Sequence, residues 1–157
     1  MKIYVASSWS CKHQPRVVEI LRGVGHEVYD FRNPAPGDNG FSWKQCKMEW
    51  SEQIVDMHDM ALYVRHITTN LAAQAGFRLD RDALHWCDTC VLVLPCGRSA
   101  HLEAGYAAGQ GKRTIILLSQ DKFEPELMYR LGHGFVTDTR ELICALQTPE
   151  LDCTTIL

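Results

Sequence analysis

The chain has 157 residues, of which 46% are hydrophobic and 22% are charged, and its formal net charge is −3 at pH 7. This length predicts one domain, spanning residues 1–157, in a soluble globular protein. The negative balance argues against a nucleic acid polymer as the main partner, and no apolar run is long enough to cross a membrane. A small anionic ligand stays compatible with this charge, because it needs only a local site.

The start of the chain and its cysteines favour a particular cellular compartment. Met1 and Lys2 lead directly into an apolar segment, so we expect no signal peptide. Seven cysteines without framework spacing favour reduced thiols and a cytoplasmic setting. Cys87 and Cys90 have CxxC spacing, but they stand at the start of a predicted strand, whereas a redox pair begins a helix. We therefore favour a structural role for this pair over redox chemistry or zinc binding.

The N-terminal segments predict a strand, a helix and a second strand. Residues 3–6 form a short apolar run, and the polar turn at residues 7–10 follows it. A helix is expected from about Pro15 to Arg22, with the glycines at 23 and 25 just beyond its end. Residues 26–31 then form the second strand. This order requires a right-handed crossover and a parallel sheet.

Residues 33–40 are dense in proline, glycine, asparagine and aspartate, which predicts a loop. Phe41, Trp43 and Trp50 follow this loop. Aromatic side chains beside a long loop could cover a pocket that holds a flat ring, or they could simply pack against one another. The sequence leaves both interpretations open.

Hydrophobic periodicity predicts the remaining helices and strands. A helical pattern runs from Ser51, as its N-cap, to about Ala75, with an interruption near residues 66–69. A further helix is expected from about residue 76 to residue 86. The later elements are a strand at 114–118, a short strand at 135–136 and a helix at 139–146, with a frayed tail from residue 148.

The central stretch is an unbroken apolar run at residues 91–94, typical of a strand buried on both faces. Pro95 and Gly97 end this strand, and Ser99 is expected to cap the helix that follows. Glu103 then falls in the first turn, where the helix dipole favours an ionised carboxylate. Small residues in this helix predict close packing against the sheet: Ala104, Gly105, Ala107, Ala108 and Gly109.

Carboxylates around this strand are the most informative candidates. Two carboxylates across a pocket, one ionised and one a proton donor, can cleave a glycosidic bond with retention. Glu103 suits the ionised role, unless it only complements the helix dipole. Asp80 and Asp82 stand two residues apart and cannot share one helix face, so at most one of them faces the pocket. Asp88 precedes the strand and is expected at the opposite end of the sheet, in a structural role.

The turn formed by Gly97, Arg98 and Ser99 is a candidate anion site. Free backbone N–H groups at a helix start, a hydroxyl and a guanidinium can together hold a phosphate. The alternative is a plain capped turn with a solvated Arg98. His101 with Glu103 matches only half of the zinc deaminase motif, and we interpret His101 as a helix-surface residue.

Several of these motifs together resemble the nucleoside 2-deoxyribosyltransferase family, which includes deoxynucleoside 5′-monophosphate N-glycosidases. The resemblance rests on Tyr4 in the first strand, on Asp80 eight residues before Asp88, and on the apolar strand that follows. The segments Leu102-Glu103-Ala104-Gly105-Tyr106-Ala107 and Gly111-Lys112 complete it. It covers about residues 1–118 and is strongest from 77 to 112.

The resemblance implies a three-layer, flavodoxin-like α/β fold with a mostly parallel sheet of about five strands. It also implies a double displacement at the sugar C1′. Glu103 matches the nucleophile, Asp80 the residue that protonates the base, and Tyr4 the tyrosine beside the nucleophile. Trp9 matches an aromatic residue of the following loop, and Asp82 is a further substrate-binding candidate. The binding turn would be Gly97, Arg98 and Ser99.

Two departures from the family pattern bear on the substrate. The turn at residues 95–101 is cationic, which favours a 5′-phosphate, and the segment from Phe41 to Ala75 has no clear counterpart. The resemblance implies a small nucleoside or nucleotide substrate, no cofactor, no metal, and a homodimer or larger homo-oligomer. The alternative functions are a non-catalytic nucleotide sensor, which would need the turn from Gly97 to Ser99 but not Glu103, and an NAD glycohydrolase.

Overall fold

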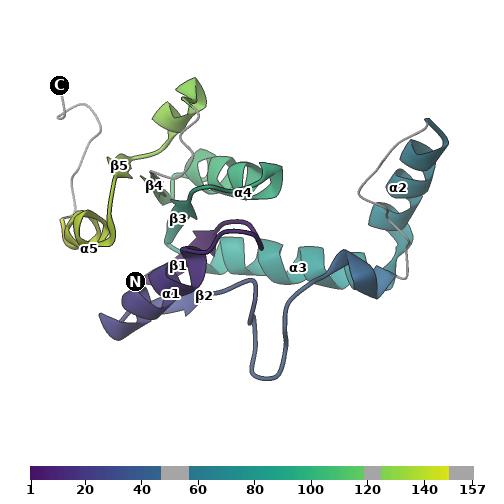
Figure 1. The fold of residues 1–157 in the computed structure, drawn as a ribbon, viewed down its shortest axis with the longest axis horizontal. Helices are drawn as coiled ribbons and strands as arrows, with labels where there is room; N and C mark the ends of the chain where they lie inside the picture. The colour runs from purple at the N-terminus through teal and green to yellow at the C-terminus, as the bar shows by residue number, and fades with distance from the viewer. Residues whose placement is uncertain (47–56, 119–124, 149–157) are drawn as a thin grey trace. The chain divides into compact units, whose positions relative to one another are not determined.

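The computed structural model describes residues 1–46, 57–118 and 125–148 (Figure 1). Its contacts divide the chain into two compact units, residues 1–30 with 84–157, and residues 31–83. Each unit is described by itself below, and the single domain stays a prediction. No helix in the described residues is both long enough and apolar enough to span a membrane.

The first unit contains a parallel sheet of five strands in the order β2-β1-β3-β4-β5 (Figure 1). The strands are β1 (Lys2–Ala6), β2 (Glu27–Tyr29), β3 (Thr89–Val93), β4 (Arg113–Leu117) and β5 (Gly134–Val136). The predicted strands and their parallel arrangement are confirmed, although β2 is shorter than expected. The helices of this unit are α1 (Gln14–Gly23), α4 (Arg98–Gly109), α5 (Thr139–Gln147), the 3₁₀ helix η2 (Leu127–Leu131) and the end of α3 (Leu71–Trp86).

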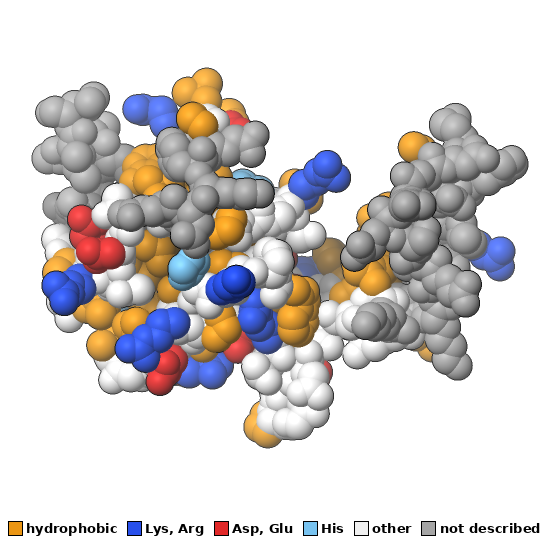
Figure 2. Space-filling view, viewed as in Figure 1, with side chains coloured by type: hydrophobic (Ala, Val, Ile, Leu, Met, Phe, Trp, Pro, Cys, Tyr) orange, Lys and Arg blue, Asp and Glu red, His pale blue; other side chains and the backbone are white. Residues whose placement is uncertain are grey.

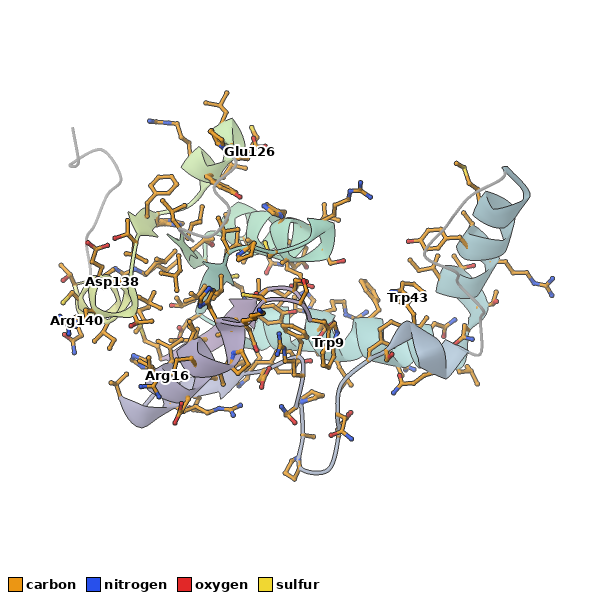
Figure 3. The ribbon with its side chains drawn as sticks, viewed as in Figure 1. Trp9, Arg16, Trp43, Glu126, Asp138 and Arg140 are labelled. Carbon is orange, nitrogen blue, oxygen red and sulfur yellow. The ribbon has the colours of Figure 1, made fainter. Side chains whose placement is uncertain are left out.

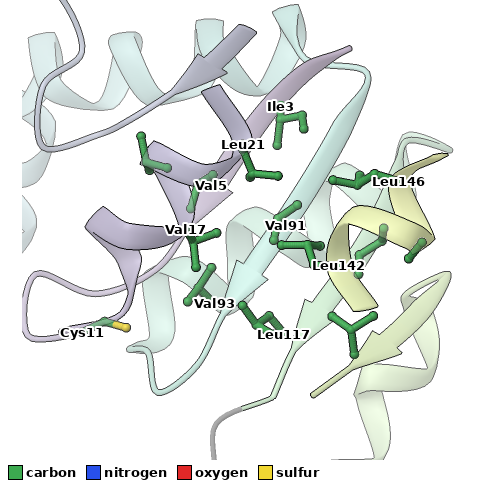
Figure 4. Packing of buried hydrophobic residues seen from close by; sticks show 14 residues of the cluster. Ile3, Val5, Cys11, Val17, Leu21, Val91, Val93, Leu117, Leu142 and Leu146 are labelled. Carbon is green, nitrogen blue, oxygen red and sulfur yellow. The ribbon is translucent and has the colours of Figure 1, made fainter. Parts of the chain in front are cut away.

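Alternation along the strands gives the sheet two different faces. One face carries the main hydrophobic core, in which side chains from β1, β3 and β4 meet those of α1 and α5 (Figure 4). Its largest members include Ile3, Val91, Ile115, Leu21 and Leu142. The other face lies under α4, which contacts β1, β3 and β4. These layers form the flavodoxin-like α/β fold expected from the sequence.

Local signals explain where the helices begin. Pro15 stands in the first turn of α1, where its missing N–H costs no hydrogen bond. The Asp138 carboxylate caps α5 and accepts hydrogen bonds from the backbone N–H groups of Arg140 at 2.7 Å and Glu141 at 2.9 Å (Figure 3). Gly25, with φ of +90°, adopts the left-handed conformation just beyond α1, which favours glycine.

The second unit contains the 3₁₀ helix η1 (Trp43–Cys46), the helix α2 (Met57–Thr69) and most of α3. The predicted interruption lies at Asn70, slightly later than expected. The Asn70 side chain accepts hydrogen bonds from the N–H groups of Ala72 at 2.9 Å and Ala73 at 3.2 Å. This cap starts α3 at Leu71, so the prediction of a separate helix from residue 76 is wrong. The predicted cap Ser51 lies outside the described residues.

The aromatic residues of this unit pack against one another. The ring centroids of Phe41 and Trp43 lie 5.2 Å apart, and those of Trp43 and Tyr63 lie 6.1 Å apart. Trp43 is labelled in Figure 3. A Cβ atom at Gly76 would lie 2.7 Å from the Phe41 Cβ, so Phe41 packs directly on α3 where glycine leaves room. These are the contacts expected if Phe41 and Trp43 simply pack against one another. Trp50 lies outside the described residues.

Replacing Leu142 by alanine tests the core between α5 and the sheet. Leu142 is 0% exposed, so Leu142→Ala should lower the free energy of unfolding by about 2–5 kcal/mol, through lost burial and the cavity left behind. Leu102→Ala is the matched control, because Leu102 is 75% exposed. Urea denaturation of both variants measures the difference, and equal losses would contradict the assignment of the core.

Candidate functional site

The carboxyl ends of β1 and β3 form the region where ligands bind in open parallel sheets. β1 is followed by α1 and β2 on one side, while its other neighbour is β3, so the strand order reverses between them. The Ser7 hydroxyl donates to the Val93 carbonyl at 2.9 Å, and the Cys11 thiol lies 3.8 Å from the Leu94 carbonyl. The loop after β1 is therefore attached to the end of β3.

Glu103 lies in the second turn of α4, as the sixth residue of a helix that begins at Arg98. The sequence-based placement in the first turn is wrong, and so is the argument from the helix dipole. The reason is that Gly97, not Ser99, is the N-cap residue, so the helix starts earlier than its hydroxyl residue suggests. Glu103 is half-buried.

The charge of Glu103 acts on two thiols. Burial, the neighbouring Cys11 and Glu103 raise the pKa of Cys96, in the turn before α4, to about 12. Burial, Cys87 and Glu103 also raise the pKa of Cys90, in β3, above its usual range. Neither thiol is prepared for nucleophilic chemistry, because that requires the thiolate.

Tyr4 lies on β1, and its register partner on β3 is Cys90. Its side chain is 0% exposed, and it shares with Cys90 the face of the sheet that α4 covers. Glu103 lies on α4, the helix that covers this face. On its other side the Tyr4 ring stacks on the Tyr29 ring of β2, with ring centroids 5.2 Å apart.

Trp9 lies in the loop between β1 and α1, and its side chain is 53% exposed (Figure 3). Two serines shape this loop, since the Ser8 and Ser10 hydroxyls lie 2.8 Å apart and the Ser10 N–H donates to the Ser8 hydroxyl at 3.2 Å. The contact of the indole with a ligand ring stays a prediction.

The predicted anion turn is open to solvent. Gly97, Arg98 and Ser99 are all exposed, and no side chain caps α4 in the described part of the chain. Backbone N–H groups at this helix start are therefore available to an anion. Ser99 lies inside the helix, so its predicted role as the cap is wrong.

His101 makes contacts that its interpretation as a helix-surface residue did not include. It is half-buried, and its Nδ1 lies 2.8 Å from the Gly97 carbonyl, which can only accept a hydrogen bond. Nδ1 therefore carries the proton, and Nε2 accepts from the Tyr129 hydroxyl at 2.9 Å. The Tyr129 and His101 rings are stacked, with centroids 5.7 Å apart. His101 thus joins the turn, α4 and η2, a link between distant segments that spacing alone does not reveal.

A hollow of about 1100 Å³ lies between α4, β4 and η2. Its walls include Leu92, Ile116, His101, Met128 and Tyr129. Figure 2 shows apolar side chains over η2, at the top of the view. At 100° per residue, Glu103 lies about 200° around α4 from His101. The hollow is therefore on the opposite flank of the helix from the candidate nucleophile.

The three aspartates considered in the sequence analysis have different surroundings in the structure. Asp88 lies at the amino end of the sheet, where its carboxylate accepts from the Lys2 N–H at 3.0 Å, so the prediction of a structural role is confirmed. Asp82 is exposed and pairs with Arg81 at 2.8 Å. Asp80 is half-buried in the second unit. Its relation to Glu103 stays a prediction.

Lys112 and Tyr106, which also belong to the motifs that carry the resemblance, bind residues at the end of α3. The Lys112 ammonium donates to three carbonyls at the end of α3, those of Leu84, His85 (2.8 Å) and Cys87 (2.7 Å). A positive charge at the C-terminal end of a helix also interacts favourably with the helix dipole. The Tyr106 hydroxyl lies 2.7 Å from His85 Nε2. These contacts give both Lys112 and Tyr106 a structural role.

The glycines of α4 lie on its outer surface, contrary to expectation. Ala100, Ala104 and Ala107 are the buried residues of the helix, whereas Gly105 and Gly109 are exposed. Within the described ranges, no group of three or more His, Cys, Asp or Glu side chains is arranged to hold a metal ion.

Comparison with solved structures shows the same fold in a nucleoside-processing enzyme. The 2-deoxyribosyltransferase of Bacillus psychrosaccharolyticus superposes with a TM-score of 0.56 and 17% identity, over 90% of each chain. The CMP N-glycosidase BcmB of Clostridium botulinum matches with a TM-score of 0.48 and 18% identity, over 94% of this chain and all of that one. No family model matches the chain, and comparison with curated proteins finds no match. The fold expected from the resemblance is confirmed.

The raised pKa values of three thiols should make the folded protein less stable at alkaline pH. Because the folded-state pKa values of Cys87, Cys90 and Cys96 are raised, the folded protein holds these protons more tightly than the unfolded chain. Their contribution is complete below the unfolded pKa of about 8.5 and is lost as the pH rises through the folded values. Denaturation in reducing buffer should show a lower free energy of unfolding at pH 10 than at pH 7.5. Cys90→Ala should reduce that slope, and an unchanged slope would contradict the assignment.

Proposed function

We propose that this protein is an enzyme that cleaves the N-glycosidic bond of a nucleoside or deoxynucleoside, or of its 5′-monophosphate. The observation that carries the proposal is the position of Glu103, a half-buried carboxylate on the helix that follows the central strand β3. It lies on the face of the sheet that also carries Tyr4, near the switch point where open α/β sheets bind ligands. The fold shared with a 2-deoxyribosyltransferase supports the same interpretation.

In the proposed first step, a Glu103 carboxylate oxygen attacks the sugar C1′. A C–O bond forms as the C1′–N bond breaks, and the bonding electron pair leaves with the base. Asp80 supplies the proton that the departing base nitrogen takes up. This division of roles requires one carboxyl with a raised pKa, which keeps its proton, and one that is ionised.

In the second step, water or the nitrogen of a second base attacks C1′ of the glycosyl ester. The C1′–O bond breaks, the Glu103 carboxylate is regenerated, and the proton of the attacking group returns to Asp80. The product is a free sugar in the first case and a new nucleoside in the second. Both outcomes follow from the same covalent intermediate.

The other candidate residues have supporting roles in this proposal. The Tyr4 hydroxyl orients the Glu103 carboxylate, and the exposed Trp9 indole contacts the base or the sugar. Asp82, which pairs with Arg81 at the surface, is the alternative to Asp80 for a contact with the substrate. The exposed Gly97–Ser99 turn receives a 5′-phosphate through its N–H groups and the Arg98 guanidinium.

We also propose that the protein acts in the cytoplasm as a homodimer or larger homo-oligomer, without a cofactor. Large apolar side chains at the surface of α4 and η2 support self-association, with Leu102 75% and Leu127 76% exposed. The resemblance, rather than these side chains, is the source of this expectation.

Removing the carboxylate at position 103 tests the nucleophile. Glu103→Ala should lower base release by about 10³-fold or more, because no covalent intermediate can form. Base release is followed by chromatography after incubation with deoxynucleosides, deoxynucleotides and NAD, with and without a second base. Glu126→Ala is the control, since Glu126 is an exposed glutamate that caps η2.

Three results would overturn the proposal in different ways. Full activity in Glu103→Ala removes the nucleophile assignment. Release of nicotinamide from NAD, without release of base from nucleotides, indicates a glycohydrolase instead. Calorimetric nucleotide binding that is unchanged in Glu103→Ala, with no product from the wild type, indicates a sensor.

Replacing Arg98 tests recognition of the phosphate. Arg98→Ala should lower kcat/KM for a deoxynucleoside 5′-monophosphate by about tenfold and leave that for the free nucleoside within a factor of about two. Lys12→Ala is the control, because Lys12 is an exposed cation in the neighbouring loop after β1. Equal losses on both substrates would contradict a phosphate contact.

A further inference from the structure

His101 attaches the turn before α4 to η2. Its Nδ1–H donates to the Gly97 carbonyl at 2.8 Å, and its Nε2 accepts from the Tyr129 hydroxyl at 2.9 Å. The planes of the His101 and Tyr129 rings differ by only 9°. Both side chains are half-buried, so these bonds are partly shielded from water. The imidazole is therefore held at both ring nitrogens.

Gly97 has a backbone that its own side does little to fix. It is the N-cap residue of α4, in an extended conformation with φ of −91° and ψ of −176°. Glycine has more backbone freedom than any other residue, and a Cβ atom at this position would meet nothing within 4 Å. In the described part of the chain no side chain caps α4. The bond from His101 therefore supplies a restraint that the glycine itself cannot.

The peptide group between Gly97 and Arg98 transmits this restraint to the turn proposed to bind phosphate. A peptide group is planar and trans, so its carbonyl and its N–H point in opposite directions. When His101 holds the Gly97 carbonyl toward the helix, the Arg98 N–H is directed outward from the helix start. An N–H group at this position has no partner inside the helix and is free to bind an anion.

Tyr129 selects the tautomer of His101 that this arrangement requires. A neutral imidazole has one donor nitrogen and one acceptor nitrogen. Because the Tyr129 hydroxyl donates to Nε2, the imidazole proton stays on Nδ1, which faces the Gly97 carbonyl. The Cys96 Sγ lies 3.5 Å from the same Nδ1, but sulfur is the weaker acceptor, so the carbonyl keeps the bond.

We infer that His101 is a positioning residue for phosphate recognition, which directs the Arg98 N–H toward the 5′-phosphate by holding the Gly97 carbonyl. This inference rests on the proposed function and deepens it. His101 itself makes no contact with the substrate in this scheme. It contributes to the preference for a 5′-monophosphate over the free nucleoside, and it leaves the reaction at C1′ unchanged.

Steady-state kinetics of base release on both substrates test the inference. His101→Leu removes the donor and should raise KM for a deoxynucleoside 5′-monophosphate about fivefold, while kcat and the kcat/KM for the free nucleoside stay within a factor of about two. His101→Asn keeps an N–H donor near the place of Nδ1, so it should restore this KM to within a factor of about two of the wild-type value.

Two further variants separate this role from a general structural one. Tyr129→Phe leaves His101 in place but no longer fixes its tautomer, so it should raise the same KM by a smaller factor, about two- to threefold. Tyr106→Phe is the matched control, because it removes another hydrogen bond between α4 and a separate segment, the one to His85 at 2.7 Å. It should leave the ratio of the two kcat/KM values unchanged.

The possible failures can be told apart. Equal losses on the two substrates, an unchanged KM in His101→Leu, or the same loss in His101→Asn as in His101→Leu would overturn the inference alone. Absence of any effect of Arg98→Ala on the monophosphate would overturn the phosphate contact, and this inference with it. A wild-type protein that releases no base from any nucleoside or nucleotide would overturn the proposed function itself.

Discussion

Four register pairs between β1 and β3, from Ile3 with Thr89 to Ala6 with Leu92, place the two central strands side by side. Nearly every feature of the candidate site depends on this pairing. It brings the loop after β1 to the end of β3, where Ser7 binds the Val93 carbonyl. It also sets Tyr4 next to Cys90, beneath the helix that carries Glu103. Residues separated by more than eighty positions become neighbours through the backbone hydrogen bonds of this strand pair.

The helix α4 has two flanks with different surroundings. Its buried alanines pack on the sheet, and this leaves Glu103 on one flank and the hollow beside η2 on the other. His101, on the second flank, is satisfied at both ring nitrogens by Gly97 and Tyr129. The proposed chemistry therefore belongs to the first flank. The stacked tyrosines extend that flank across the sheet to its edge strand.

Strand positions followed from local pattern, because short apolar runs that are bounded by proline, glycine or polar turn residues are typical of buried strands. The helices of the first unit were also located well, since proline and glycine stand near the two ends of α1. The errors arose where competing signals lay close together. Ser99 is a good cap residue by type, yet Gly97 takes that position, and Glu103 moves into the second turn. Likewise, Asn70 starts α3 earlier than the hydrophobic period suggested.

The sequence by itself determined the parallel α/β architecture, the central strand and the identity of the acidic candidates, because these depend on composition and on neighbours along the chain. Only the tertiary structure decided which side chains share a surface. The stacking of Tyr4 on Tyr29, the link from His101 to Tyr129, and the capture of three α3 carbonyls by Lys112 all join distant segments. Such contacts are products of strand order and register, which a single sequence does not express locally.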